Sequence, residues 1–130
     1  MSALAETLAP PGAPAAGIME AGDSLLNHLF YHGTPEGFEA VRSIPVDDWP
    51  DPLQAEIAQG LVEAHDAGIA PEAWRGAKSL ESVKVIKRIL DTRPSLNPEL
   101  IAGDIKADAQ RRRVMLRTHE LVNILPFCKD

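Results

Sequence analysis

The sequence has very little cysteine, few aromatic residues and no long apolar run. Cys128 is its single cysteine, so no disulfide can form within the chain, which fits a reducing compartment. Aromatic residues make up 5% of the chain, so the core must be built from Leu, Ile, Val and Ala, a composition that favours helices over sheets. Because no run of about 20 apolar residues occurs, we expect no membrane span.

Residues 1–17 have neither the basic start nor the apolar stretch of a secretory signal. They carry Glu6 and three prolines within a segment rich in alanine. Their apolar bulk is too small to offset the entropy of ordering. We therefore predict a flexible Ala/Pro-rich N-terminal tail over 1–17, a single helical domain over 18–130 and, in the absence of a targeting segment, a cytoplasmic location.

Basic residues are almost missing from the first half of the chain. Residues 1–72 contain 12 acidic residues and one base, Arg42, whereas residues 73–130 contain 7 acidic residues and 12 bases. The two parts carry about −11 and +5, which together give the net charge of −6. This distribution predicts one of two outcomes. Either the folded protein has a negative and a positive end, or the acidic and basic halves of the chain pair and neutralise each other. The sequence leaves open whether they meet within one molecule or between two.

Several helices are predicted to begin with the same chemistry, a capping side chain followed by proline. Thr34, Asp51 and Asn97 each precede a proline, and Ser79 is a further cap. Apolar residues then recur at helical spacing, and the wide apolar arc of 80–91 predicts that this helix is central. We predict an all-α fold, a compact irregular bundle of about five helices. The predicted helices cover 18 or 23 to 31, 35–43, 52–66, 80–91 and 98–124, with a short turn at 71–75.

The last predicted helix has two apolar faces, turned about half a revolution from one another. One face consists of Ile101, Ile105 and Ala109, and the other of Val114, Leu121, Val122 and Leu125. Either the helix breaks near 109–113, or one long helix packs its two ends against different surfaces. The second arrangement leaves apolar area for a partner to cover.

An arginine cluster lies between these two faces. Arg111, Arg112, Arg113 and Arg117 have the planar guanidinium that suits carboxylate or phosphate. Three interpretations stay open: the cluster is solvated or pairs with the acidic half of the chain, it binds an acidic protein, or it binds nucleic acid. Lys84 and Arg88 align one helical turn apart and add to the basic surface.

Each of the two tryptophans allows two readings. Trp49 lies in an acidic loop and either folds into the core or forms an exposed anchor rimmed by acids. Trp74 has the same ambiguity. The candidate binding residues are therefore Trp49, Trp74, Lys84, Arg88, Arg111, Arg112, Arg113 and Arg117.

No catalytic motif is present. His28 and His32 have the spacing of two metal ligands on a helix, but a metal needs three or four and the other candidates are scattered. Cys128 lies near the chain end, where no base is fixed beside it. We predict no enzyme activity, no metal site and no cofactor.

These observations favour a non-catalytic protein-interaction protein: an accessory subunit, adaptor, chaperone or inhibitor of a larger assembly. Its partner is expected to be a protein, in a homo- or hetero-oligomer. The alternative is a nucleic-acid-associated regulator that uses the basic C-terminal half. A second alternative is a small metal-binding protein or enzyme that uses His28, His32 or Cys128.

Overall fold

The structure, a computed structural model, describes residues 13–71, 74, 76–77 and 79–128, and for residues 120–128 the backbone alone. Most of the predicted tail and of the predicted turn at 71–75 therefore lies outside the described residues. The all-α prediction is confirmed, because the described residues form a compact helical bundle without strands. The elements are α2 (Ile18–Tyr31), α3 (Pro35–Arg42), the 3₁₀ helix η1 (Val46–Asp48), α4 (Pro52–Asp66), α5 (Leu80–Asp91) and α6 (Pro98–Cys128).

The predicted caps start the helices. The Thr34 hydroxyl accepts from the Gly37 N–H at 3.0 Å, and the Asp51 carboxylate accepts from the Leu53 N–H at 3.0 Å. Ser79 caps α5 through the N–H of Ser82, and Asn97 caps α6 through the N–H of Leu100. Each cap satisfies a backbone donor that the first helical turn leaves unpaired.

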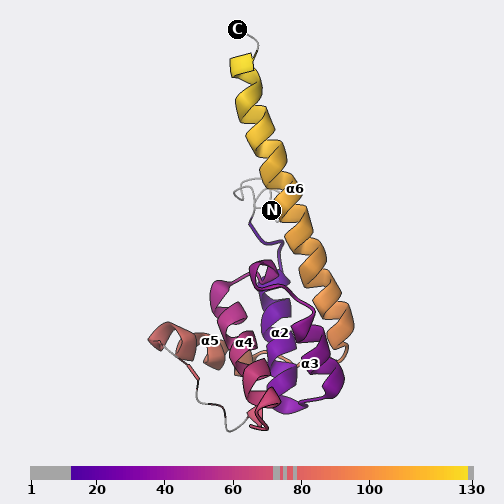
Figure 1. Cartoon of the computed structure of the whole chain (residues 1–130), viewed down its shortest axis with the longest axis vertical. Helices are drawn as coiled ribbons and strands as arrows, with labels where there is room; N and C mark the ends of the chain where they lie inside the picture. Colours follow the sequence, from indigo (N-terminus) through magenta and orange to yellow (C-terminus); the bar gives the residue numbers. More distant parts are fainter. Residues whose placement is uncertain (1–12, 72–73, 75, 78, 129–130) are drawn as a thin grey trace.

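Helix α2 lies at the centre of the bundle and packs against α3, α4, α5 and α6 (Figure 1). The prediction that 80–91 is central is wrong. Helix α5 contacts α2 and α4 and buries Ser82, Val85 and Ile89, while part of its wide apolar arc faces solvent. An apolar arc alone does not fix a helix at the centre, because the neighbours that cover it are chosen by the tertiary packing. The fully buried core side chains include Leu25, Leu26, Leu29, Phe38, Ile57, Leu61, Ile89 and Ile105.

Helix α6 is continuous for 31 residues and does not break at 109–113. Its first half buries Ala102, Ile105 and Ala109 against the bundle, where it packs on α2 and α3. Its second half rises away from the bundle (Figure 1). The predicted end at 124 is also corrected, because the helix reaches Cys128 and includes Pro126. Pro126 has no N–H to donate to the preceding turn, yet the helix continues two residues beyond it.

Candidate interaction surface

The arginine cluster binds α6 to the rest of its own chain. Arg112 donates to the Asp108 carboxylate at 2.9 Å and to the backbone carbonyl of Asp48 at 3.1 Å. Arg113 forms an ion pair with the Asp48 carboxylate. Arg111 donates to Asp108 at 2.9 Å and to the carbonyl of Ala13 at 3.2 Å. Three of the four cluster arginines thus make contacts within their own chain, and Arg113 pairs with an acid of the N-terminal half, as the first of the three interpretations expects.

Asp108 is the acceptor at the centre of this junction. It is 7% exposed and also accepts from the Ala15 N–H at 3.1 Å. Burial by itself raises the pKa of this carboxyl, but the hydrogen bonds from Arg111 and Ala15 and the charge of Arg112 outweigh it and hold the pKa below its ordinary value. The carboxylate is therefore ionised when it holds the two arginines.

Arg88 makes a second internal cross-link, from α5 to α2. Its Nε donates to the buried Asp23 carboxylate at 2.6 Å and its Nη2 donates at 3.0 Å, while Asp51 lies 3.6 Å from the same guanidinium. Gln54 donates to Asp23 at 2.7 Å. The hydrogen bond to Asp23 raises the pKa of Arg88. Arg88 is thus engaged within the bundle, whereas Lys84 is exposed and lies 3.6 Å from Glu81.

These contacts answer the question about the charge halves that the sequence left open. Asp23 and Asp48 belong to the acidic half, and their partners Arg88 and Arg113 belong to the basic half of the same molecule. The two halves therefore meet inside one chain. In the described structure each of four arginines pairs with a carboxylate of the same chain: Arg88, Arg111, Arg112 and Arg113.

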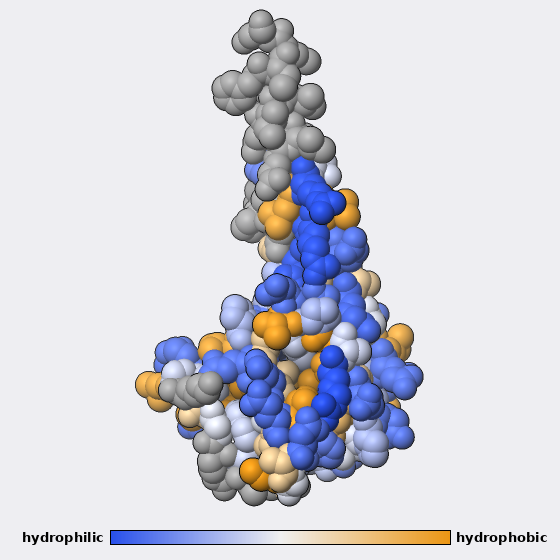
Figure 2. All heavy atoms as spheres, viewed as in Figure 1, coloured by the Kyte–Doolittle hydropathy of each residue, from blue (hydrophilic) through white to orange (hydrophobic). Residues whose placement is uncertain are grey.

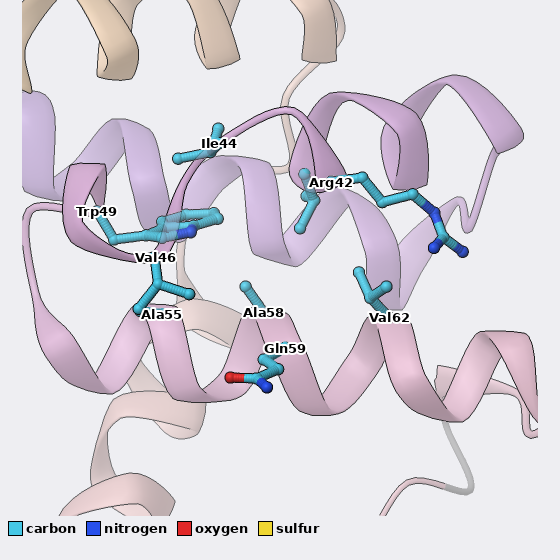
Figure 3. Close-up of a pocket in the computed structure, with 9 residues that line it drawn as sticks. Arg42, Ile44, Val46, Trp49, Ala55, Ala58, Gln59 and Val62 are labelled. Atoms are coloured by element: carbon cyan, nitrogen blue, oxygen red, sulfur yellow. The ribbon is translucent and has the colours of Figure 1, made fainter.

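Trp49 is 5% exposed, so the reading that places it in the core is confirmed and its role as an exposed anchor is corrected. Its ring forms one wall of a shallow groove of about 430 Å³ beside α4. Figure 3 shows Ile44, Val46 and Trp49 facing the alanines and the valine of α4 across this groove, with Arg42 at the end opposite Trp49. The groove exists because alanine occupies two successive turns of α4, at Ala55 and Ala58.

Trp74 is half-buried and packs on the core over Gly60. A Cβ added at Gly60 would meet its ring at 2.6 Å, so the indole lies directly on the α4 backbone. This placement makes Trp74 a cover for α4, which is a packing role.

His28 is buried, and both of its ring nitrogens are occupied. Nδ1 lies 2.7 Å from the carbonyl oxygen of Ser95, which can only accept, so Nδ1 carries the proton in the neutral ring. Nε2 then accepts from the Thr34 hydroxyl at 2.7 Å. His28 therefore links α2 to the cap of α3 and has no nitrogen left for a metal beside His32. Within the described part of the chain, no group of three or more His, Cys, Asp or Glu residues is placed to hold a metal ion.

The distal half of α6, which we define as residues 114–128, carries exposed apolar side chains at its start. Val114, Met115 and Leu116 are 53%, 41% and 44% exposed. Figure 2 shows hydrophobic side chains on both sides of a charged stripe where α6 stands clear of the bundle. Arg117 is exposed one turn further on. The side chains of residues 120–128 lie outside the described part, but their sequence is rich in Leu, Ile, Val and Phe.

Sequence reasoning missed the buried acids that hold the arginines. Asp23, Asp48 and Asp108 are each buried, and none of them was predicted by name to pair with an arginine. A signal for Asp108 was present, because Arg111 and Arg112 follow it by three and four residues, the spacing at which helical side chains meet. For Asp23 and Asp48 the partners lie 65 residues away, and no local pattern identifies them.

No protein-family model matches the chain, and no curated protein or solved structure matches it. Over the described residues, none of the helices combines the length and the apolar character that crossing a membrane requires.

Proposed function

We propose that this chain is a non-catalytic protein-interaction protein whose docking element is the distal half of α6. The observation that carries the proposal is a helix that continues beyond its own bundle with apolar side chains open to solvent. Along α6, the last described ion pair with the bundle is that of Arg113 with Asp48. Fifteen residues of α6 follow it.

Apolar side chains on a helix that projects into solvent call for a physical explanation. A solvated extension gains from charged and polar residues, whereas exposed Val, Met and Leu have a cost in water. From Val114, the sequence continues with Leu121 and Leu125 seven and eleven residues on, which is the spacing of one helix face. This pattern fits a partner that lays an apolar helix or groove against α6.

The experiment compares capture of proteins from an extract of the source cells by three immobilised full-length chains. They are the wild type, Val114→Glu/Leu121→Glu, and a control, Leu80→Glu/Leu96→Glu, which places the same charges on exposed leucines of the bundle. We expect wild type and control to retain the same proteins and the α6 variant to lose them at least tenfold. The solution mass of each chain, by light scattering, reports whether the partner is a second copy. Equal retention and equal mass for all three chains would overturn the proposal.

The melting temperature of the α6 variant provides a control on folding. Val114 follows the ion pair of Arg113 with Asp48 and is 53% exposed, so the α6 variant is expected to melt at the same temperature as wild type. A variant that melts earlier would show that the distal half contributes to the stability of the bundle, which contradicts a separate docking element.

A further inference from the structure

The groove beside α4 adjoins a second hollow of about 350 Å³, with which it shares Val46, Trp49 and Ala55. Residues between 41 and 49 line the two hollows on one side and residues between 52 and 62 of α4 line them on the other, and we call both together the α4 groove. The α4 side of this lining rises about 15 Å at 1.5 Å per residue. The α4 groove is therefore long enough for about three turns of a second helix.

The α4 groove has an apolar lining that is partly open to solvent. Ala55 and Ala58 face the groove from α4, and Val46 and Trp49 face them from the other side (Figure 3). Val46 lines both hollows and is 61% exposed. Because alanines leave room above α4, larger apolar side chains of a partner can fill the groove and remove Val46 from water.

The architecture around the α4 groove favours a helical occupant. An extended peptide binds by adding a strand to the edge of a sheet, and the described part of the chain has no strand. A groove beside a helix takes the apolar face of an amphipathic helix instead, whose side chains recur every three or four residues.

Acidic side chains lie at the end of the α4 groove where α4 begins. Asp47 and Glu56 line the second hollow. Asp47 is exposed, and Glu56 is half-buried and accepts from the Ser82 hydroxyl at 3.5 Å. Within the described residues neither of them takes part in an ion pair, whereas Asp48 of the same 3₁₀ helix pairs with Arg113. These two carboxylates are therefore available to a basic partner.

The opposite end of the α4 groove carries a base that is already paired. Arg42 forms an ion pair with Asp66 and lies 3.6 Å from the Glu39 carboxylate. Two acids of the same chain thus balance its charge. The charge that the α4 groove leaves for a partner is negative, and an electrostatically complementary partner carries positive charge.

We propose that the α4 groove binds an amphipathic helix of a partner protein. Apolar side chains on one face of that helix enter the groove, and lysine or arginine at the edge of that face pairs with Asp47 and Glu56. This surface is separate from the distal half of α6, so the inference does not rest on the proposed function. The two surfaces together would let one chain hold two partner segments at once.

A synthetic peptide of about 14 residues tests the proposal, with leucines on one helical face and lysines along the edges of that face. It is added to the ¹⁵N-labelled full chain, and the indole N–H signals of both tryptophans are followed. We expect the signal of Trp49 to move to saturation and that of Trp74, which lies outside the α4 groove, to move less. A Trp49 signal that does not move would overturn the proposal.

Two further peptides test the charge and the helix separately. One has glutamates in place of the lysines, and the other has a proline at its centre, which breaks a helix. Each is expected to bind at least tenfold more weakly than the lysine peptide. Equal binding by the glutamate peptide would contradict a basic partner, and equal binding by the proline peptide would contradict a helical one.

Reversing the acids of the α4 groove provides a test on the side of the protein. Asp47→Lys/Glu56→Lys is expected to weaken binding of the lysine peptide at least tenfold and to strengthen binding of the glutamate peptide. The matched control is Asp91→Lys/Asp104→Lys, which changes the net charge equally at exposed acids outside the groove. An equal loss in both variants would show attraction by the overall charge alone and would overturn the site.

A change without charge tests the apolar part of the contact. Val46→Ser is expected to weaken the lysine peptide at least threefold, and Val114→Ser, at a similarly exposed valine of α6, is expected to leave binding unchanged. Unchanged binding to the Val46→Ser chain would place the peptide outside the α4 groove. The Val114→Glu/Leu121→Glu chain is expected to bind the peptide as wild type does, so failure of the proposed function leaves this result intact.

The solution mass separates a foreign helix from a second copy of the chain. By light scattering, Asp47→Lys/Glu56→Lys is expected to have the same mass as wild type. A lower mass for this variant would show that a second copy occupies the α4 groove, which overturns the proposal of a foreign partner.

Discussion

At the scale of single residues, three buried acids organise the bundle. Asp23, Asp48 and Asp108 each accept from one or two arginines of the C-terminal half. A carboxylate taken out of water has a large desolvation cost, which a bidentate guanidinium offsets. Removing such an arginine leaves a buried charge without its main partner.

Arg88→Ala is expected to lower the free energy of unfolding by about 2–3 kcal/mol, because Asp23 would keep Gln54 as its main remaining donor. The matched control is Lys84→Ala on the same helix, whose exposed pair with Glu81 contributes less than about 1 kcal/mol. Denaturant unfolding of the three chains measures both. Equal losses for the two variants would show that Asp23 does not depend on Arg88.

The lowered pKa of Asp108 predicts a pH dependence of stability. A carboxyl whose folded pKa lies below its unfolded value stabilises the fold above the unfolded pKa, near 4. That contribution is lost as the pH falls through the folded pKa. The difference in unfolding free energy between wild type and Asp108→Asn should therefore be largest at neutral pH and shrink in acid. Asp104→Asn, an exposed site on the same helix, serves as the control and should show a small difference at every pH.

At the scale of elements, the approach of α2 to α4 depends on a glycine. A Cβ at Gly22 would lie 2.7 Å from the side-chain amide of Gln54, which donates to Asp23 and to the Met19 carbonyl. The Gln54 side-chain amide thus links two residues of α2 to α4. The glycine therefore keeps the polar contact between the two helices in place.

Two glycine-to-alanine changes should have opposite signs. Gly22→Ala is expected to destabilise by about 1–3 kcal/mol, because the methyl group displaces Gln54. Gly103→Ala, in α6 with open space around its Cα, is expected to stabilise by about 0.5–1 kcal/mol through helix propensity. Thermal melting of both variants provides the comparison. If both variants were more stable than wild type, the Gln54 side chain could move aside for the new methyl group without a loss of stability.

At the scale of the whole molecule, the acidic and basic halves of the sequence are joined inside one chain by the pairs of Arg88 with Asp23 and of Arg113 with Asp48. Exposed Val114, Met115 and Leu116 follow the second of these pairs along α6. The association that we propose for the distal half of α6 is apolar, so added salt is expected not to weaken it.

The solution mass of the full chain is accordingly expected to be no lower at ~1 M than at ~0.05 M sodium chloride, as measured by light scattering after size exclusion. The Val114→Glu/Leu121→Glu chain is the control and should show the monomer mass of 14.1 kDa at both. A wild-type oligomer that dissociates in high salt would mean that charged halves also meet between chains.

The sequence by itself determined the helices and their starts. Thr34, Asp51, Ser79 and Asn97 cap helices through bonds to donors two or three residues away, and such local chemistry can be read from the order of residues. The sequence also determined that α6 has two apolar faces. It placed the acidic residues mainly in the first half of the chain and the basic residues in the second. What each face and each charge meets was decided by the tertiary structure. Arg88 and Arg113 find carboxylates 65 residues away, α2 rather than α5 takes the centre, and Trp49 turns inward. Those outcomes depend on the packing of segments that are distant in the sequence. A local pattern does not specify which distant segment will pack against it.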